Sequence, residues 1–551
     1  MRVIAKYFKE AFREYTKEFA VCIILAVIMM LVGVLIPIGS RYYIMQVSND
    51  CGINIILVGL LVFCGMYAIK TVINIFLYRA LDLFGGRYMS HLSLSLEKTL
   101  QKADYADIKM MSEGVLRNIL YTDVINVFVT VGHHIPNIVS SLLTIVLLLI
   151  YMMFQDMWMS LLILTATIIG IFISVKSKHH IAEAVKETNL MMKKFDAGCS
   201  EYISLIPLVQ TNNLVGYFQR KTNSAIGAFI EASRKADVPV DLWTGLVGGY
   251  HSVFSILLSA ILVWPAAGHN VVDMLFFTLI ANMILSESQN VSQMILQVVR
   301  NIPSYNNVEK VRSLKKADGD KEIDDIEKIE FENVTFSYPD SEQKVLENVS
   351  FSLRKGDTVC IKGLNGAGKS TFYKLLTGLY RPVAGVVKID GDSLTEVKRE
   401  SLNKQILYIS QDEKCLNGSI KNYLSEISGS DISDETIEKW QEKLHFNRED
   451  EMITGNGDSL SGGQRKKLFL MKLLARADSS AVIIADELAA GMDVETVPIM
   501  QELLSEYAKK HDKIFFITDH QNYGNVECNV VLTFKGGKVE IEAAEPKTYW
   551  K

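Results

Sequence analysis

The chain has 551 residues, which is too many for one hydrophobic core and indicates two or more domains. Hydrophobic residues make up 49% of it and charged residues 22%, a balance that a large soluble enzyme could share. The net charge of −5 gives no argument for a nucleic-acid partner, and we expect none. The seven cysteines include no CxxC pair, which argues against a zinc ribbon or a disulfide framework, so we expect reduced, apolar fillers.

The first half of the chain carries uncharged apolar runs of membrane-spanning length. Residues 1–19 mix apolar and charged positions at helical spacing, which predicts an interfacial elbow helix along the inner leaflet. A transmembrane domain of about six helices over 20–300 follows, with spans at 20–37, 53–69, 135–154, 158–175, 242–267 and 274–286. The last run is the weakest because Asp273, Asn282 and Glu287 interrupt it. Buried helices of a soluble protein are the alternative, and the number of runs argues against it.

Basic residues are distributed unevenly around these spans. Residues 1–19, 79–133 and 176–241 are rich in Lys and Arg, whereas the links 38–52, 155–157 and 268–273 hold only Arg41. The positive-inside rule therefore places the N-terminus, both long loops and the C-terminal half in the cytoplasm. Helical periodicity in the two long loops predicts that the membrane helices continue into the cytosol.

Polar residues within the spans are the only hints about a cargo. They are Lys70, Asn74, Asn282, Glu287, Gln289 and Asn290. Lys70 and Glu287 could pair or face a wet cavity, or each could snorkel to the interface.

The composition changes after a charged linker at 301–326. From 327 to 551, short β-rich runs alternate with helical patterns, which predicts an α/β domain with a partly parallel sheet. Within it, "GLNGAGKST" (363–371) follows the strand-like "DTVCI" and precedes a helical run, as in a P-loop. The loop residues that we expect to hold the phosphates are Gly363, Asn365, Gly366, Gly368, Lys369, Ser370 and Thr371. Lys369 supplies the positive charge, and the Ser370 hydroxyl is a ligand for Mg²⁺.

A second motif completes the predicted hydrolytic site. The buried run "AVIIADE" brings Asp486 to the end of a strand, where it can hold the Mg²⁺ shell. Glu487 is placed to orient or deprotonate the attacking water.

Further motifs point to one family. "SLSGGQRKKL" (459–468) resembles the signature motif of ATP-binding cassette (ABC) proteins, and the order of motifs is similar to theirs. The resemblance implies that Tyr338 stacks on adenine, that His520 is the switch histidine and that Asp493 is the aspartate of the loop after the acidic strand. It also implies that Gln411 senses the γ-phosphate and contributes to the Mg²⁺ site. ATP bound to one cassette would then be capped by a second one, through Ser461, Gly462, Gly463 and Gln464.

The whole layout resembles that of bacterial type IV ABC exporters. The resemblance implies a multi-pass protein of the plasma membrane, with ATP and Mg²⁺ as cofactors, in which each chain is a half-transporter. Its partner would be an identical or related chain. Coupling loops are implied near 105–111 and 203–213. The sequence departs from the family at Gly455, which replaces a glutamate, and in "DELAAGMD", where Leu488 and Ala490 stand for proline and serine.

Three functions compete. The first is an ATP-driven exporter of a peptide, lipid or drug-like molecule. The second is an ABC-type regulator or ATP-gated channel that binds nucleotide without pumping cargo. The third, a soluble ABC ATPase, is excluded by the spans. Intact Glu487, Ser461 and His520 favour the exporter, which would be an ATPase.

Overall fold

The structure, a computed structural model, describes residues 2–49, 53–176, 178–263, 271–410, 413–446, 452–489, 492–509, 512–518 and 526–543. Gln411, His520 and Ala490 lie outside the described residues. Two compact units emerge from the internal packing. The helical unit comprises Met1–Leu100 and Met111–Ser313, and the α/β unit comprises Gln101–Met110 and Leu314–Lys551.

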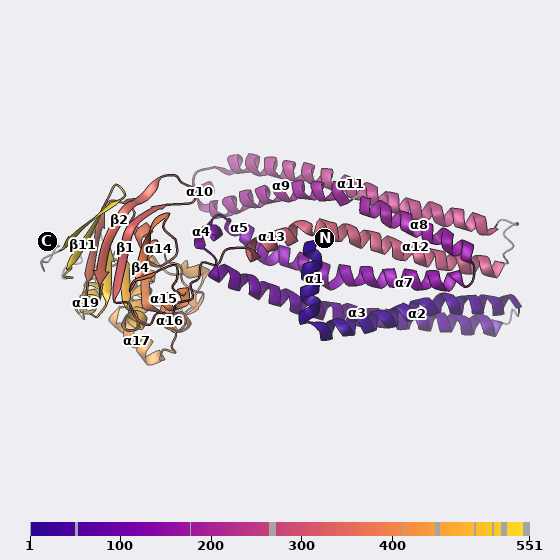
Figure 1. The fold of residues 1–551 in the computed structure, drawn as a ribbon, viewed down its shortest axis with the longest axis horizontal. Helices are drawn as coiled ribbons and strands as arrows, with labels where there is room; N and C mark the ends of the chain where they lie inside the picture. The colour runs from indigo at the N-terminus through magenta and orange to yellow at the C-terminus, as the bar shows by residue number, and fades with distance from the viewer. Residues whose placement is uncertain are drawn as a thin grey trace. The chain divides into compact units, whose positions relative to one another are not determined.

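The helical unit consists of long helices that run side by side, crossed by the short N-terminal α1 (Figure 1). Its helices are α1 (Arg2–Glu14), α2 (Thr16–Asn49), α3 (Ile53–Lys102), α5 (Glu113–Asn118), α6 (Val124–Val129), α7 (Ile135–Met153), α8 (Met157–Lys176), α9 (Lys178–Ser204), α10 (Ile206–Thr211), α11 (Val215–Val263), α12 (Val271–Arg300) and α13 (Ile302–Arg312). Two π-helical turns, Ile119–Asp123 and Thr130–His134, join α5, α6 and α7 into one continuous helix.

Four helical stretches in the described part of the chain are long and apolar enough to cross a membrane: Thr16–Val47, Ile56–Lys102, Glu113–Met153 and Asp241–Ile261. Met157–Ile173 forms a shorter apolar helix at the fourth predicted span. These five correspond to five of the predicted spans. The sixth predicted span lies in α12, which is helical but is not among these stretches, so the count of six remains a prediction.

Described residues of the three links that are poor in basic residues lie together at one end of the helical unit. Arg41 donates to Oδ1 of Asp273 at 3.1 Å and also to the side chain of Gln155. Its guanidinium lies 4.9 Å from the ring centre of Phe276. The Arg41 side chain therefore connects α2 to the α7–α8 link and to the start of α12.

At α1, the apolar residues face protein. Ile4, Tyr7 and Ala11 are buried and share one face. The Tyr7 hydroxyl donates to Glu309 at 2.9 Å, and Arg312 pairs with Glu10. Part of the expected linker at 301–326 is therefore helical. Residues 302–312 form α13, because they have buried partners on α1.

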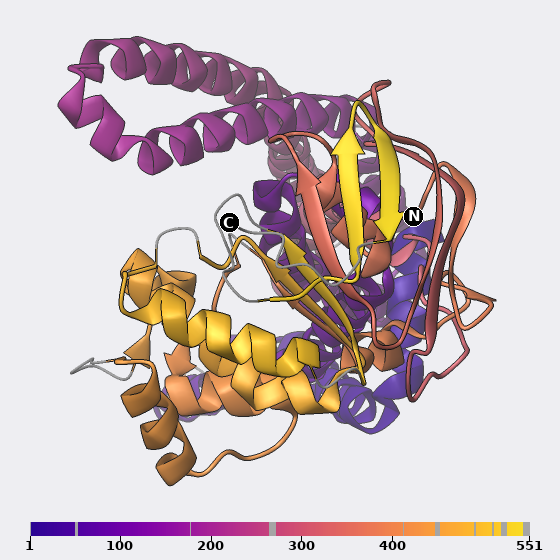
Figure 2. The same cartoon turned by 90° about the vertical axis from the view of Figure 1, so that its left-hand side faces the viewer.

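In its described residues, the α/β unit contains three sheets. Figure 2 shows strands of this unit beside the orange and yellow helices. The larger sheet has the order β12-β11-β3-β10-β9-β6, and the second has the order β2-β1-β4-β5. The strands are β1 (Lys328–Ser337), β2 (Lys344–Arg354), β3 (Thr358–Gly363), β4 (Ala384–Ile389), β5 (Asp392–Ser393), β6 (Ile406–Ile409), β7 (Gly418–Ser419), β8 (Met452–Ile453), β9 (Val482–Asp486), β10 (Ile514–Thr518), β11 (Val530–Lys535) and β12 (Lys538–Ala543). The helices are α4 (Tyr105–Lys109), α14 (Lys369–Leu376), α15 (Arg399–Gln405), α16 (Ile420–Ser428), α17 (Asp434–Lys443), α18 (Gly462–Arg476) and α19 (Thr496–Lys509).

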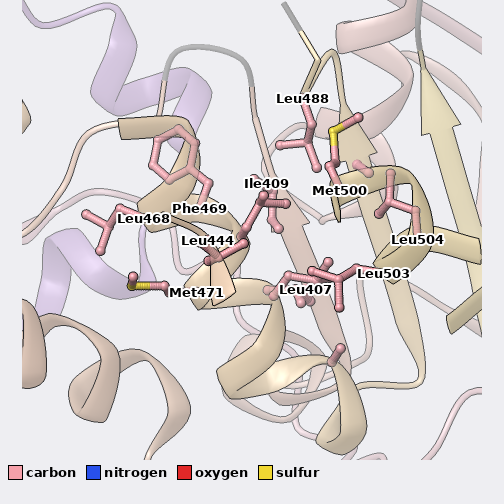
Figure 3. Close-up of a cluster of buried hydrophobic side chains, with 14 of the residues drawn as sticks. Leu407, Ile409, Leu444, Leu468, Phe469, Met471, Leu488, Met500, Leu503 and Leu504 are labelled. Carbon is pink, nitrogen blue, oxygen red and sulfur yellow. The ribbon is translucent and has the colours of Figure 1, made fainter. Parts of the chain in front are cut away.

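A buried apolar cluster fixes α18 and α19 against the larger sheet (Figure 3). Leu407 and Ile409 of β6 contribute from the sheet, Leu468 and Phe469 from α18, and Leu503 from α19. Leu488, which replaces the family's proline, is itself fully buried in this cluster. The leucine at this position is thus part of the core.

Two of the cysteines do not fit the sequence-based expectation. Cys360 of β3 and Cys528, just before β11, form a disulfide with their Cα atoms 5.9 Å apart. The prediction that every cysteine is a reduced filler is therefore wrong for this pair, because parallel pairing of β3 with β11 brings the two positions together.

Candidate nucleotide site

The predicted motifs converge at one edge of the larger sheet. β3, β10, β9 and β6 are parallel neighbours, so their carboxyl ends meet at the same edge. The P-loop follows β3, and Asp486 is the last residue of β9. In the sequence, Gln411 follows β6 and His520 follows β10 by two residues each.

The P-loop backbone depends on glycine conformations. Gly366 and Gly368 have φ of +80° and +105°, a left-handed conformation that other residues adopt only with strain. At Gly368, an added Cβ would lie 3.1 Å from Leu346 and 3.2 Å from the carbonyl of Val345. The glycines therefore allow the loop to turn tightly before α14 begins.

The first two residues of α14 differ in exposure: Lys369 is buried and Ser370 is exposed. Lys369 is 6% exposed, and its Nζ donates to the carbonyl of Gly363 at 2.9 Å, inside the loop. Ser370 is exposed, so its hydroxyl is accessible. Thr371 is buried, and its hydroxyl bonds to that of Tyr338 at 2.9 Å.

Asp486 is a buried carboxyl at the strand end. It is 4% exposed, and its Oδ2 accepts a hydrogen bond from Tyr408 of β6 at 3.4 Å. Burial, with a further contribution from neighbouring Glu487, raises the pKa of Asp486 to about 6. A bound cation would favour the charged form of this carboxyl, so its chemistry fits a Mg²⁺ ligand.

Glu487 is half-buried and has an unusual backbone conformation. Its φ is +50°, in the left-handed region. Its N–H donates to the carbonyl of Thr518 at the end of β10, and Lys466 of α18 donates to its carbonyl at 3.3 Å. The neighbouring strand and the signature helix both anchor the residue.

The signature residues form a separate helix start. Ser461 caps α18, since its hydroxyl accepts from the Gln464 N–H and the Gln464 side chain accepts from the Ser461 N–H. Ser461 and Gly462 are exposed, and Gly462 and Gly463 have open space around the position of a Cβ. The N-terminus of a 15-residue helix with an uncovered backbone can bind an anion.

Sequence reasoning missed three buried lysines of α18: Lys466, Lys467 and Lys472. Lys467 donates to the carbonyl of His445 at 2.9 Å and lies 3.3 Å from Asp493, while Lys472 donates to the carbonyl of Tyr408 at 3.0 Å and pairs with Glu413. Three lysines spaced among apolar residues of one helix were the available signal. They attach α18 to the segments around the acidic strand.

Tyr338 lies at the end of an aromatic row that starts on α4. The ring of Tyr105 in α4 packs edge-on against Tyr380, with ring centres 5.5 Å apart, and Tyr380 packs edge-on against Tyr338 at 5.4 Å. Asp104 lies 3.6 Å from Arg381, and Arg399 donates to two carbonyls of residues 101–103. Residues 105–110 of the first implied coupling loop are therefore part of the α/β unit, and Tyr105 connects to Tyr338 through Tyr380.

The second implied coupling loop and Gly455 lie elsewhere in the chain. Residues 203–213 include α10 and belong to the helical unit. Gly455 has φ of +60°, and Asn456 beside it has φ of +56°. The family's glutamate would be strained at position 455, which explains the glycine.

Comparison with known proteins places both halves of the chain in related families. Residues 346–490 match the family described as "ABC transporter", and residues 19–287 match "ABC transporter transmembrane region". The chain is 36% identical over 209 residues to an ATP-dependent lipid A-core flippase of Photorhabdus laumondii and 33% identical over 238 residues to that of Aliivibrio fischeri. It is 26% identical over 359 residues to a β-(1→2)glucan export ATP-binding/permease protein of Rhizobium etli.

These alignments cover 36%, 40% and 62% of this chain and span 34%, 40% and 60% of the relatives' own lengths. A solved structure of a bacterial Atm1-family ABC exporter with ATP bound aligns over 96% of this chain and 95% of its own chain, with a TM-score of 0.83. Its sequence identity is 17%, so this likeness concerns the fold.

Proposed function

The chain belongs to the ABC transporters and is a multi-pass membrane protein with an ATP-binding cassette, and from this premise we propose that it is an ATP-driven exporter. The observation that carries the proposal is the convergence of the P-loop, Asp486 and Glu487 at one sheet edge, on a chain that also carries membrane helices. ATP hydrolysis at that edge would drive movement of the spans.

Each residue of the site has a proposed part. Lys369 and the backbone of 363–371 bind the β- and γ-phosphates, and Tyr338 stacks on adenine. Ser370, Asp486 and Gln411 would hold Mg²⁺, which neutralises phosphate charge when bound. Glu487 orients the attacking water, with His520 beside the γ-phosphate.

The active form is proposed to be a dimer of half-transporters. Supporting this, the anion-binding start of α18 is exposed and makes its capping bonds only within itself. The tip between α9 and α11 also exposes Ile203 and Leu208, 66% and 46% exposed, an apolar surface suited to a cassette of the partner. The relatives named above are bacterial, and we propose the inner membrane as the location.

The proposal is tested by ATP hydrolysis and transport in reconstituted vesicles. Glu487→Gln should reduce the kcat of hydrolysis by about 100-fold or more while ATP still binds. Glu400→Gln, a change to a side chain 68% exposed, is the matched control and should behave as wild type. Unaltered hydrolysis in Glu487→Gln would disprove its role, and hydrolysis without movement of any cargo would favour a regulator or channel.

A further inference from the structure

One face of α12 changes from apolar to polar along the helix. Exposed residues recur at intervals of four and three: Leu275, Leu279, Asn282, Ser286, Asn290, Gln293 and Gln297. This spacing puts all of them on one face. The last five form what we call the polar stripe, which has no charged member and is about 22 Å long at 1.5 Å per residue.

The opposite face of α12 holds the helix in place. Phe276, Ile280, Ile284 and Val291 are buried in an apolar cluster with α7 and α8, so the polar stripe is directed outward from that cluster. Glu287 is not part of the polar stripe. Its Oε2 accepts a hydrogen bond of 2.6 Å from Ser141 of α7, so this carboxylate, for which the sequence left pairing with Lys70, a wet cavity and snorkelling open, is directed to a neighbouring helix.

The adjacent part of α11 has small side chains. Ser255 donates to Oδ1 of Asn282 at 2.7 Å, and a Cβ on Gly248 would lie 3.7 Å from the amide nitrogen of Gln289. Gly245 and Gly249 are exposed and have open space around them. Because α11 has small side chains at these positions, they leave the exposed carboxamides of the polar stripe accessible.

A lipid environment does not suit the polar stripe. Exposed positions of α7 are apolar, as at Leu142, Val146 and Ile150, which suits contact with acyl chains. Carboxamides in hydrocarbon would leave several donors and acceptors unpaired, which is costly. Wherever the stripe lies within the membrane, it must therefore meet water or a polar molecule.

We propose that the polar stripe lines the transport path and binds an uncharged cargo dense in hydroxyl or amide groups; this inference rests on the proposed exporter function. Each carboxamide offers both donors and an acceptor, so successive turns of α12 can bond such a molecule along its length. A charged cargo would find no opposite charge on the stripe. An apolar cargo would leave the carboxamides unpaired.

Water access is tested first, on the full chain in nanodiscs. Ser286→Cys, Asn290→Cys and Gln293→Cys should each react with a charged, water-soluble thiol reagent faster than the parent protein. Val146→Cys and Ile150→Cys, at exposed apolar positions of α7, are the controls and should not. Stripe cysteines as unreactive as these controls would mean that the spans of another chain cover the stripe, which would overturn the proposal.

Cargo chemistry is tested by stimulation of ATP hydrolysis. The probes are a neutral linear oligosaccharide, a capped uncharged peptide, a lipophilic cation and a phosphorylated glycolipid. Stimulation of at least about twofold by the oligosaccharide or the peptide supports the inference and identifies the hydroxyl or the amide source. Stimulation by the cation or the glycolipid alone, or by none of the four, overturns it.

A substitution links the effect to the stripe. Asn290→Leu with Gln293→Met keeps similar side-chain volumes and removes the polar groups, so half-maximal stimulation should need about tenfold more cargo. Gln219→Met, the same kind of change at an exposed position near the start of α11, is the matched control and should leave that concentration unchanged; an equal shift in both would overturn the assignment. Wild-type basal hydrolysis, abolished by Glu487→Gln, tests the proposed function separately, so hydrolysis without neutral-cargo stimulation would refute only this inference.

Discussion

The backbone of Glu487 is held from two sides. Its φ of +50° is a conformation that costs roughly 1–2 kcal/mol for a residue with a Cβ. Bonds from its N–H to Thr518 and from Lys466 to its carbonyl oppose that cost. Strain kept at one residue by surrounding bonds is common where a side chain must point in a fixed direction.

We therefore expect Lys466→Met to act on catalysis more than on binding. Without the bond to the Glu487 carbonyl, the Glu487 carboxylate is no longer held in a fixed direction. The kcat of hydrolysis should therefore fall about 10- to 100-fold, while KM for ATP changes by less than about twofold. Steady-state hydrolysis by the reconstituted protein measures both. Lys404→Met, at a side chain 70% exposed, is the surface control. A wild-type kcat in Lys466→Met would show that the bond does not position Glu487.

The Cys360–Cys528 disulfide gives a second prediction about individual residues. Peptide mapping of the non-reduced protein should find the two positions linked, and reductant should destabilise the cassette by about 2–4 kcal/mol and lower its Tm. Cys528→Ser should remove the dependence of Tm on reductant. Cys415→Ser, at a buried free cysteine, should keep it. Two freely alkylated thiols before reduction would contradict the prediction.

The helices and strands that sequence could predict are those with local signals. The P-loop lies between a strand and a helix within about a dozen residues, and the acidic strand is one apolar run, so periodicity and glycine placement are enough. The disulfide joins positions 168 residues apart, and the partners of Lys466 and Lys472 are Glu487, just after β9, and Tyr408 in β6. Such contacts depend on the assembled sheet, so composition and spacing cannot predict them. The helix α13 was missed for the same reason, since its partners lie on α1.

The row of tyrosines joins α4 to the nucleotide site, and its contribution can be measured. Edge-to-face ring pairs contribute about 0.5–1.5 kcal/mol beyond burial. In a double-mutant cycle, Tyr105→Leu and Tyr380→Leu should show a coupling of that size in ATP affinity, because Tyr380 packs on Tyr338. Nucleotide binding by the full chain is the measurement. Tyr121→Leu, at an exposed tyrosine of the helical unit, should be additive with Tyr380→Leu, and additivity of the Tyr105 pair would refute the connection.

A cassette that needs a second copy has its phosphate-binding and capping surfaces on different chains. The P-loop site is built from β3, β9 and α14. Ser461 and Gly462, by contrast, form an exposed helix start, and its capping hydrogen bonds join Ser461 to Gln464 of the same helix. In a two-fold dimer, each composite site would take the P-loop of one chain and the signature of the other. That arrangement makes a prediction that a self-contained cassette does not.

Lys369→Ala and Ser461→Arg should each abolish hydrolysis when present in every chain. Co-expressed in equal amounts, they should restore it, because a mixed dimer pairs the intact P-loop of one chain with the intact signature of the other. About half of randomly formed dimers are mixed and each has one intact site of two, so about a quarter of wild-type activity is expected if the sites act independently. The control is co-expression of wild type with the Lys369→Ala, Ser461→Arg double variant, whose mixed dimers break both composite sites. A pair of single variants as inactive as its parents would show that each cassette uses its own signature or that hydrolysis at one site requires the other.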